Sequence, residues 1–94
     1  MPDDGSERNK KRMNSNGNLY CVCREMSDGK KIYIHLYNDV REATAAALSC
    51  FRMLSEYDKK RVSYSVEYGR FAYDDNGRIL LFYSITKKII QIKE

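Results

Sequence analysis

The clearest pattern in the chain is an alternation of aliphatic and ring-bearing side chains within residues 30–39. Its members follow one another as Ile32, Tyr33, Ile34, His35, Leu36 and Tyr37. Alternation with a period of two predicts a β-strand with one buried face. The other face is unusual, because it would carry two tyrosines and the single histidine of the chain where a solvated strand has Lys, Glu or Thr.

Residues 19–26 alternate as well, and Asp28-Gly29 between the two runs is a favoured pair for a two-residue hairpin turn. Counting outward from that turn predicts these cross-strand pairs: Cys23–Ile34, Cys21–Leu36 and Glu25–Ile32 on one face, and Arg24–Tyr33, Val22–His35 and Tyr20–Tyr37 on the other. A four-residue loop would give the same pairs, whereas a three-residue loop with a bulge would shift them by one. We favour the two-residue register because it places the cysteines beside aliphatic side chains.

The segment that follows, residues 38–61, has helical periodicity. Asn38 or Asp39 can cap the helix, and Glu42 lies three residues beyond Asp39, as in a variant of the capping box. One apolar stripe is formed by Val40, Ala43, Ala47, Cys50, Phe51, Leu54 and Tyr57. We expect the helix to end between residues 57 and 60, where basic side chains suit the negative end of its dipole.

The last third of the chain is predicted to be β-structure. Residues 62–68 alternate, Gly69 is expected to mark a bulge, and Asn76-Gly77 gives a second hairpin signal. That turn predicts the pairs Tyr73–Leu80 and Phe71–Phe82 on one face, and Ala72–Leu81 and Tyr68–Ile85 on the other. Residues 86–88 are expected to divide the final run into two short strands.

These elements predict an α+β fold of the ββαββ type with an optional fifth strand, in which one helix packs on one face of an antiparallel sheet. The fold is expected to form one domain over residues 19–94. Residues 1–18 are polar and are predicted to be a disordered tail, since they cannot bury enough apolar surface to offset the entropy of ordering. Met1 and Met13 are both candidate native starts.

Composition and charge narrow the class of protein. The net charge of the chain is +4, of which residues 1–18 contribute +1, so residues 19–94 are only mildly basic. This charge permits an acidic partner but is weaker than expected of a dedicated DNA-binding protein. No run approaches the roughly 20 apolar residues of a membrane span, and the polar N-terminus is unlike a secretory signal. With three cysteines in no framework spacing, these features predict a cytoplasmic protein with reduced thiols.

The spacing of the chemically reactive residues does not favour a metal site or a catalytic site. Cys21, Cys23, His35 and Cys50 are the residue types that bind zinc, but the C-x-C spacing is not the common one and the predicted register separates His35 from both strand cysteines. The same separation argues against a Cys–His nucleophile. Carboxylates do not converge in the predicted fold, and a glycine-rich phosphate loop is lacking. We expect a non-enzyme without a metal, a cofactor or a small-molecule substrate.

The second face of the sheet is the leading candidate site. One helix covers only one face, yet large apolar side chains occur at both parities of the last hairpin: Leu80 and Phe82 at one, Ile79, Leu81 and Tyr83 at the other. The sequence leaves open which parity faces the helix, and whether the tail or residues 89–94 cover the second face. An apolar, tyrosine-rich surface favours a protein partner or self-association, as in an adaptor, regulator or inhibitor. The predicted partner-binding residues are Tyr20, Tyr33, His35, Tyr37, Phe71, Tyr73, Leu80 and Phe82.

Single-stranded nucleic acid is the alternative partner. Short basic clusters occur with tyrosines between them, and single-strand binders combine basic grooves with aromatic stacking surfaces. Lysine pairs at turns are also common as solvated protection for strand ends. The candidate nucleic-acid contacts are Lys30, Lys31, Lys59, Lys60, Arg61, Lys87 and Lys88.

Overall fold

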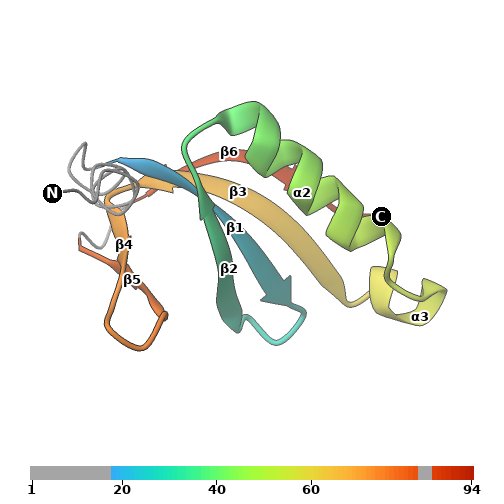
Figure 1. Cartoon of the computed structure of the whole chain (residues 1–94). Helices are drawn as coiled ribbons and strands as arrows, with labels where there is room; N and C mark the ends of the chain where they lie inside the picture. The colour runs from blue at the N-terminus through green and yellow to red at the C-terminus, as the bar shows by residue number, and fades with distance from the viewer. Residues whose placement is uncertain (1–17, 83–85) are drawn as a thin grey trace, which may run out of the picture.

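The computed structural model describes residues 18–82 and 86–94 (Figure 1). The predicted tail, apart from Asn18, and the expected pairing of Ile85 lie outside these residues. The elements in chain order are β1 (Leu19–Met26), β2 (Lys31–Tyr37), α2 (Val40–Arg52), α3 (Glu56–Lys59), β3 (Val62–Gly69), β4 (Phe71–Tyr73), β5 (Ile79–Leu81) and β6 (Lys87–Ile92). Within the described ranges, no helix is long and apolar enough to cross a membrane.

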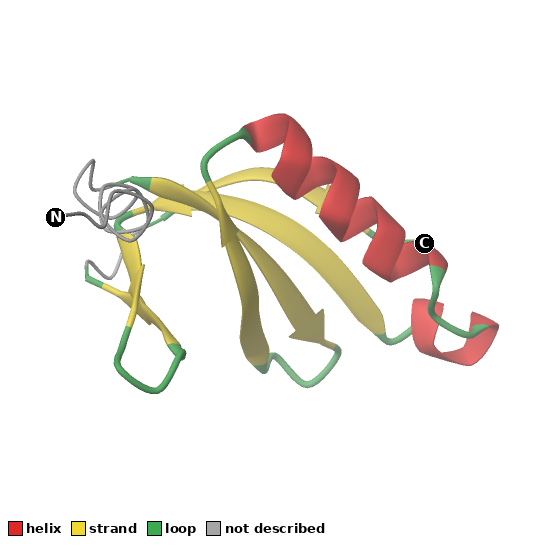
Figure 2. Ribbon diagram, viewed as in Figure 1, coloured by secondary structure: helices red, strands yellow, loops and turns green. Residues whose placement is uncertain are grey.

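The main sheet has four antiparallel strands in the order β2-β1-β3-β6. Helix α2 lies across one face of this sheet, and β4 with β5 forms a separate two-stranded hairpin at one end (Figures 1 and 2). The predicted α+β class with ββαββ order is therefore confirmed. The last run is divided into β5 and β6, but not at the expected residues, since Lys87 and Lys88 belong to β6.

Helix α2 packs closely on the central strands because alanine occupies its buried positions. Asp39 caps the helix by accepting a hydrogen bond from the Arg41 N–H at 2.9 Å. Ala43 and Ala47 are fully buried against the helix-side core. That core is formed by Val22, Ala43, Ala47, Val62, Tyr64 and Val66.

The helix ends earlier than predicted. Residue 55 has an extended backbone (φ −67°, ψ 163°), so α2 stops at Arg52 and Ser55 caps the separate short helix α3. The Ser55 hydroxyl accepts a hydrogen bond from the Asp58 N–H at 3.1 Å. Tyr57, predicted to belong to the apolar stripe, is instead 65% exposed. Serine at this position competes for helix initiation, which the apolar periodicity did not reveal.

Both hairpin turns are three-residue loops rather than the predicted two-residue turns. In the first, the Gly29 N–H donates to the Met26 carbonyl at 3.0 Å and the Met26 N–H donates to the Lys30 carbonyl at 2.8 Å. Gly29 has φ +94°, which suits the left-handed closing position of such a loop. The pairs near the turn are therefore shifted by one from those predicted, to Cys23–Tyr33, Arg24–Ile32 and Glu25–Lys31.

A bulge at Ile34 restores the predicted register beyond it. The pairs Cys21–Leu36, Val22–His35 and Tyr20–Tyr37 are confirmed. The second hairpin closes in the same way around Gly77 (φ +80°), so its predicted pairs are wrong by one. The observed pairs are Phe71–Leu81, Ala72–Leu80 and Tyr73–Ile79, while Tyr68 pairs with Tyr20 and Lys87.

Hairpin β4–β5 covers part of the sheet face opposite α2 and forms a second core there. Its buried members are Leu19, Cys21, Cys23, Leu36 and Phe71, with Tyr33, Ile79 and Leu81 packed against them. Neither parity of the hairpin faces the helix, although the prediction assumed that one would: Ile79 and Leu81 point into the second core, and Leu80 and Phe82 are exposed. The predicted bulge at Gly69 is wrong, since the β1–β3 register is unbroken to its pair with Leu19. The change of apolar parity reflects the second core instead.

Candidate functional site

The predicted common aromatic face of β2 does not form, because the bulge at Ile34 puts Tyr33 on the opposite side of the sheet from His35 and Tyr37. Tyr33 packs into the second core, with its ring centroid 5.5 Å from that of Phe71. Tyr37 and Tyr20 pack against the helix-side core instead. Phe71, also predicted to bind a partner, is only 1% exposed. The two tyrosines of β2 therefore pack against the two cores, and neither is free to form the predicted binding face.

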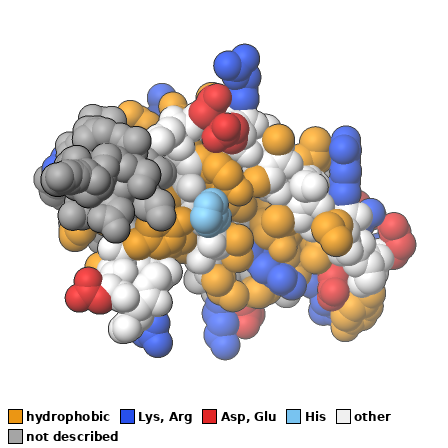
Figure 3. Space-filling model, viewed as in Figure 1, with side chains coloured by type: hydrophobic (Ala, Val, Ile, Leu, Met, Phe, Trp, Pro, Cys, Tyr) orange, Lys and Arg blue, Asp and Glu red, His pale blue; other side chains and the backbone are white. Residues whose placement is uncertain are grey.

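What β2 does expose is aliphatic. Ile32 is 48% and Ile34 is 41% exposed, and His35 is also exposed. Figure 3 shows hydrophobic side chains around the histidine over β2, continuing toward α2. We define the β2 surface as Ile32, Ile34, His35 and the half-buried Tyr37. The sequence placed the first two on the buried face, so no signal identified them.

Tyr73 fastens the β4–β5 hairpin to the edge of β2. Its hydroxyl oxygen accepts a hydrogen bond from the Leu36 N–H at 3.2 Å and lies 3.1 Å from Nδ1 of His35. This contact occupies an edge donor of β2 and fixes the histidine ring beside the two exposed isoleucines.

The exposed residues of the hairpin lie on its outer side. Leu80 is 42% and Phe82 60% exposed, because their neighbours Ile79 and Leu81 take the inner side. The structure thus divides the predicted binding set. Part of it builds the two cores, part fastens the hairpin, and Leu80 and Phe82 form a second exposed apolar pair away from the helix.

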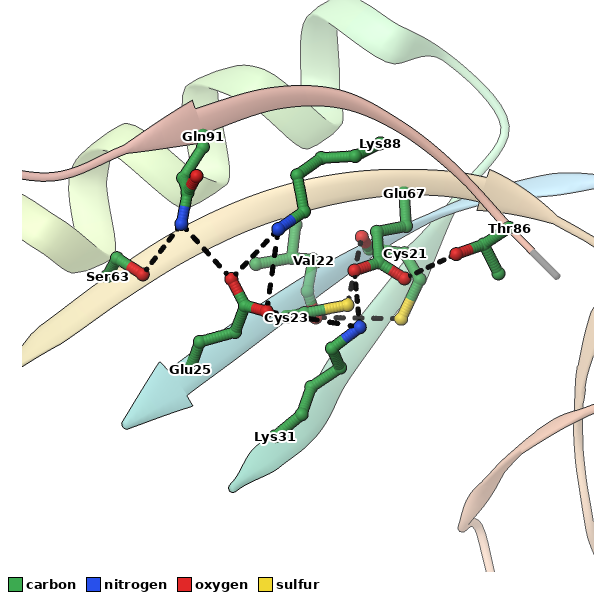
Figure 4. A network of polar contacts seen from close by, with 10 residues as sticks. All are labelled: Cys21, Val22, Cys23, Glu25, Lys31, Ser63, Glu67, Thr86, Lys88 and Gln91. Carbon is green, nitrogen blue, oxygen red and sulfur yellow. Dashed lines mark hydrogen bonds and ion pairs between the residues drawn. The ribbon is translucent and has the colours of Figure 1, made fainter. Parts of the chain in front are cut away.

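The uncovered part of the sheet face opposite α2 carries a polar network (Figure 4). Lys31 reaches from β2 across β1 to Glu67 on β3, where Nζ donates to Oε2 at 2.6 Å. Thr86 donates to the other oxygen of the same carboxylate at 2.7 Å. Glu67 is buried, and its hydrogen bond raises the pKa of Lys31 above the ordinary lysine value although burial opposes this.

A second cross-strand ion pair runs in the opposite direction. Lys88 reaches from β6 across β3 to Glu25 on β1 at 3.2 Å, and Gln91 donates to Glu25 and Ser63. Sequence reasoning did not identify this network. Its only signal was the polar alternation of Ser63, Ser65 and Glu67 on β3.

The cysteines are packed as small apolar groups. Cys21 and Cys23 lie in the second core, and Cys50 packs against the helix-side core. Hydrogen bonding with Cys23 and burial raise the pKa of the Cys21 thiol far above its ordinary value, which suppresses the nucleophilic thiolate. In residues 18–82 and 86–94, no three His, Cys, Asp or Glu side chains form a cluster that could hold a metal ion.

The basic residues predicted to contact nucleic acid are separated by the fold. Lys31 and Lys88 are held by carboxylates in the sheet network. Lys59, Lys60 and Arg61 instead meet around a cavity beside α3. The aromatic sheet face on which these lysines were expected to converge is not there.

Comparison with protein families, curated proteins and solved structures finds no match to this chain.

Proposed function

We propose that this protein is a non-catalytic binding module, an adaptor, regulator or inhibitor, that docks on a protein partner through the β2 surface. The observation that supports this most is the exposure of Ile32 and Ile34 on an edge strand next to His35, which has hydrophobic side chains around it (Figure 3). Contiguous exposed apolar surface typically marks an interaction site.

The β2 surface is also rigidly supported. Leu36 and Tyr33 are anchored in the second core, Tyr37 packs toward α2, and Tyr73 holds the hairpin against the strand. A surface fixed in this way loses little conformational entropy when a partner docks. The two isoleucines would act as the apolar centre of the interface and His35 as a polar neighbour.

Docking through side chains fits this edge better than addition of a partner strand. The Leu36 N–H is already bonded to Tyr73, and the bulge at Ile34 interrupts the regular ladder. A partner protein, or a second copy of this chain, would therefore present apolar side chains rather than a free strand edge.

The test compares two variants at matched positions. Ile34 and Ile89 both lie at bulges in edge strands and have nearly equal exposure, 41% and 40%. Ile34→Ser should weaken a complex detected by affinity capture from cells that make the protein, or self-association measured by sedimentation velocity. A hot-spot loss of about 2 kcal/mol corresponds to a weakening of roughly 30-fold.

Ile89→Ser is the control and should leave the same complex intact. Equal losses in both variants, or none in either, would contradict docking through β2. Circular dichroism and thermal midpoints of all variants establish that each remains folded.

A further inference from the structure

A second region of interest lies around α3, at the opposite end of the sheet from the β4–β5 hairpin (Figure 1). A cavity of about 340 Å³ lies here between the β1–β2 turn, the end of α3 and the residues after β6. Its charged lining residues are Glu25, Lys59, Lys60, Arg61, Lys93 and Glu94.

The charge balance of this cavity is positive. Four basic side chains line it against two acidic ones, and one of the four, Lys59, is paired with Glu56 at 3.4 Å. Glu25 is engaged by Lys88 at 3.2 Å, outside the cavity, so its charge is largely neutralised. Within the described part of the chain, Lys60 and Arg61 form no ion pair with a carboxylate. An anion entering the cavity would meet Lys60 and Arg61 without displacing a carboxylate from either.

An exposed aromatic ring lies beside this basic cavity. The guanidinium of Arg61 lies 4.3 Å from the ring centroid of Tyr57, which is 65% exposed. Arg61 therefore belongs both to the cavity lining and to a stacked pair. The Ser55 cap holds the start of α3, the short helix that carries Tyr57.

We propose that this region binds single-stranded nucleic acid, with a backbone phosphate in the cavity and an adjacent base stacked on Tyr57. Lys60 and Arg61 would contact the phosphate, and Tyr57 with Arg61 would form the stacking platform. Basic groups beside an exposed aromatic ring are the combination that sequence-tolerant single-strand binders use. This site is separate from the β2 surface, so it goes beyond the function proposed above.

The test uses fluorescence anisotropy of the full chain with labelled oligothymidylate and oligouridylate, each at two salt concentrations. Tyr57→Ala should weaken binding by about fivefold or more, whereas Tyr57→Phe should retain it. Lys60→Gln should weaken binding to both strands and lower the salt slope by about 1. Arg41→Gln removes the same charge at the far end of α2 and serves as the matched control.

Binding that is lost with Tyr57→Ala and Lys60→Gln but kept with Arg41→Gln supports the site. DNA and RNA are distinguished by the two oligonucleotides. The proposal is overturned if the wild-type chain binds neither strand. It is equally overturned if Tyr57→Ala has no effect, or if Arg41→Gln weakens binding as much as Lys60→Gln does.

Discussion

The two edge strands of the main sheet share the same backbone features but expose different kinds of side chain. Both β2 and β6 bulge at an isoleucine, Ile34 and Ile89, next to the same central Val22–Val66 pair. Each edge also sends one lysine across its neighbour to a carboxylate on the strand beyond. Yet β6 continues with exposed Lys87, Lys88 and Gln91, whereas β2 continues with exposed Ile32 and His35.

This difference shows which exposed edge residues are accounted for by the stability and solubility of the fold itself. Lysines and a bulge are ordinary protection of a sheet edge against association, and β6 has both. On β2 the bulge is present, but its lysine is paired with Glu67, and two of its exposed positions, Ile32 and Ile34, are apolar. Edge protection does not account for the exposure of Ile32 and Ile34, which the proposed docking on a partner would bury.

The largest expected effect concerns the support beneath β2. Phe71→Ala should reduce the free energy of unfolding by about 3–5 kcal/mol, because its ring is buried in the second core against Tyr33. Phe51→Ala, whose ring is only partly buried against the helix-side core, should cost less. Urea denaturation of both variants measures the two losses, and a smaller loss for Phe71→Ala would mean that the hairpin does not support β2.

The crossing lysines should differ next. Lys31→Met leaves the buried Glu67 carboxylate without its cation and should cost about 3 kcal/mol, at the low end for a buried ion pair because Lys31 is one-third exposed. Lys88→Met breaks an exposed pair and should cost at most about 1 kcal/mol. Urea denaturation at pH 7 measures both losses of stability, and comparable losses would contradict the expected difference between the two ion pairs.

The sequence predicted the order of elements and the capped start of α2 because both depend on local chemistry, such as Asp39 before an apolar stripe. It could not choose between two- and three-residue turns, since Asp-Gly and Asn-Gly suit either loop. The Ile34 bulge depends on the twist and pairing of the whole sheet. The Lys31–Glu67 contact joins residues 36 positions apart, and no local pattern encodes such a pair.

The candidate site suffered from the same limitation. An error of one position in the first turn exchanged the faces of Tyr33 and Ile32. Tyr37 was paired correctly with Tyr20, but their face, expected to be open, is the one that α2 covers. Alternation specifies that two faces differ, but the register decides which residues occupy each.

Alkaline pH should also affect the β2 side. Four groups on β1 and β2 have a pKa raised above its ordinary value, namely Cys21, Lys31, Tyr33 and Tyr37. Hydrogen bonding and burial protect the proton on Cys21, and burial is the main cause for both tyrosines.

A raised pKa contributes stability that is complete below the ordinary value and is lost as the pH rises above it. For Cys21 the loss should begin near pH 9 and amount to about 1.4 kcal/mol per pH unit. Urea denaturation between pH 7 and pH 10 should show the decline in the free energy of unfolding. In Cys21→Ala, the part of the decline that begins near pH 9 should be absent. An unchanged free energy of unfolding at pH 10 would contradict the burial of this thiol.

The smallest expected effect is on the stability of the two edge variants. Ile34→Ser and Ile89→Ser should each change the free energy of unfolding by no more than about 0.5 kcal/mol, because both side chains are substantially exposed. Thermal and urea denaturation check this. A large loss for Ile34→Ser alone would place that side chain in the core and remove the basis for a docking role.

Site-specific photo-crosslinking tests the central claim most directly. A photoreactive p-benzoylphenylalanine is placed at position 34 in one sample and at position 89 in another, and both are irradiated in cells that make the protein. Docking through β2 predicts a defined protein adduct, with a partner or a second copy, from position 34 and little from position 89. Equal adducts from both positions, or an adduct from position 89 alone, would contradict the account.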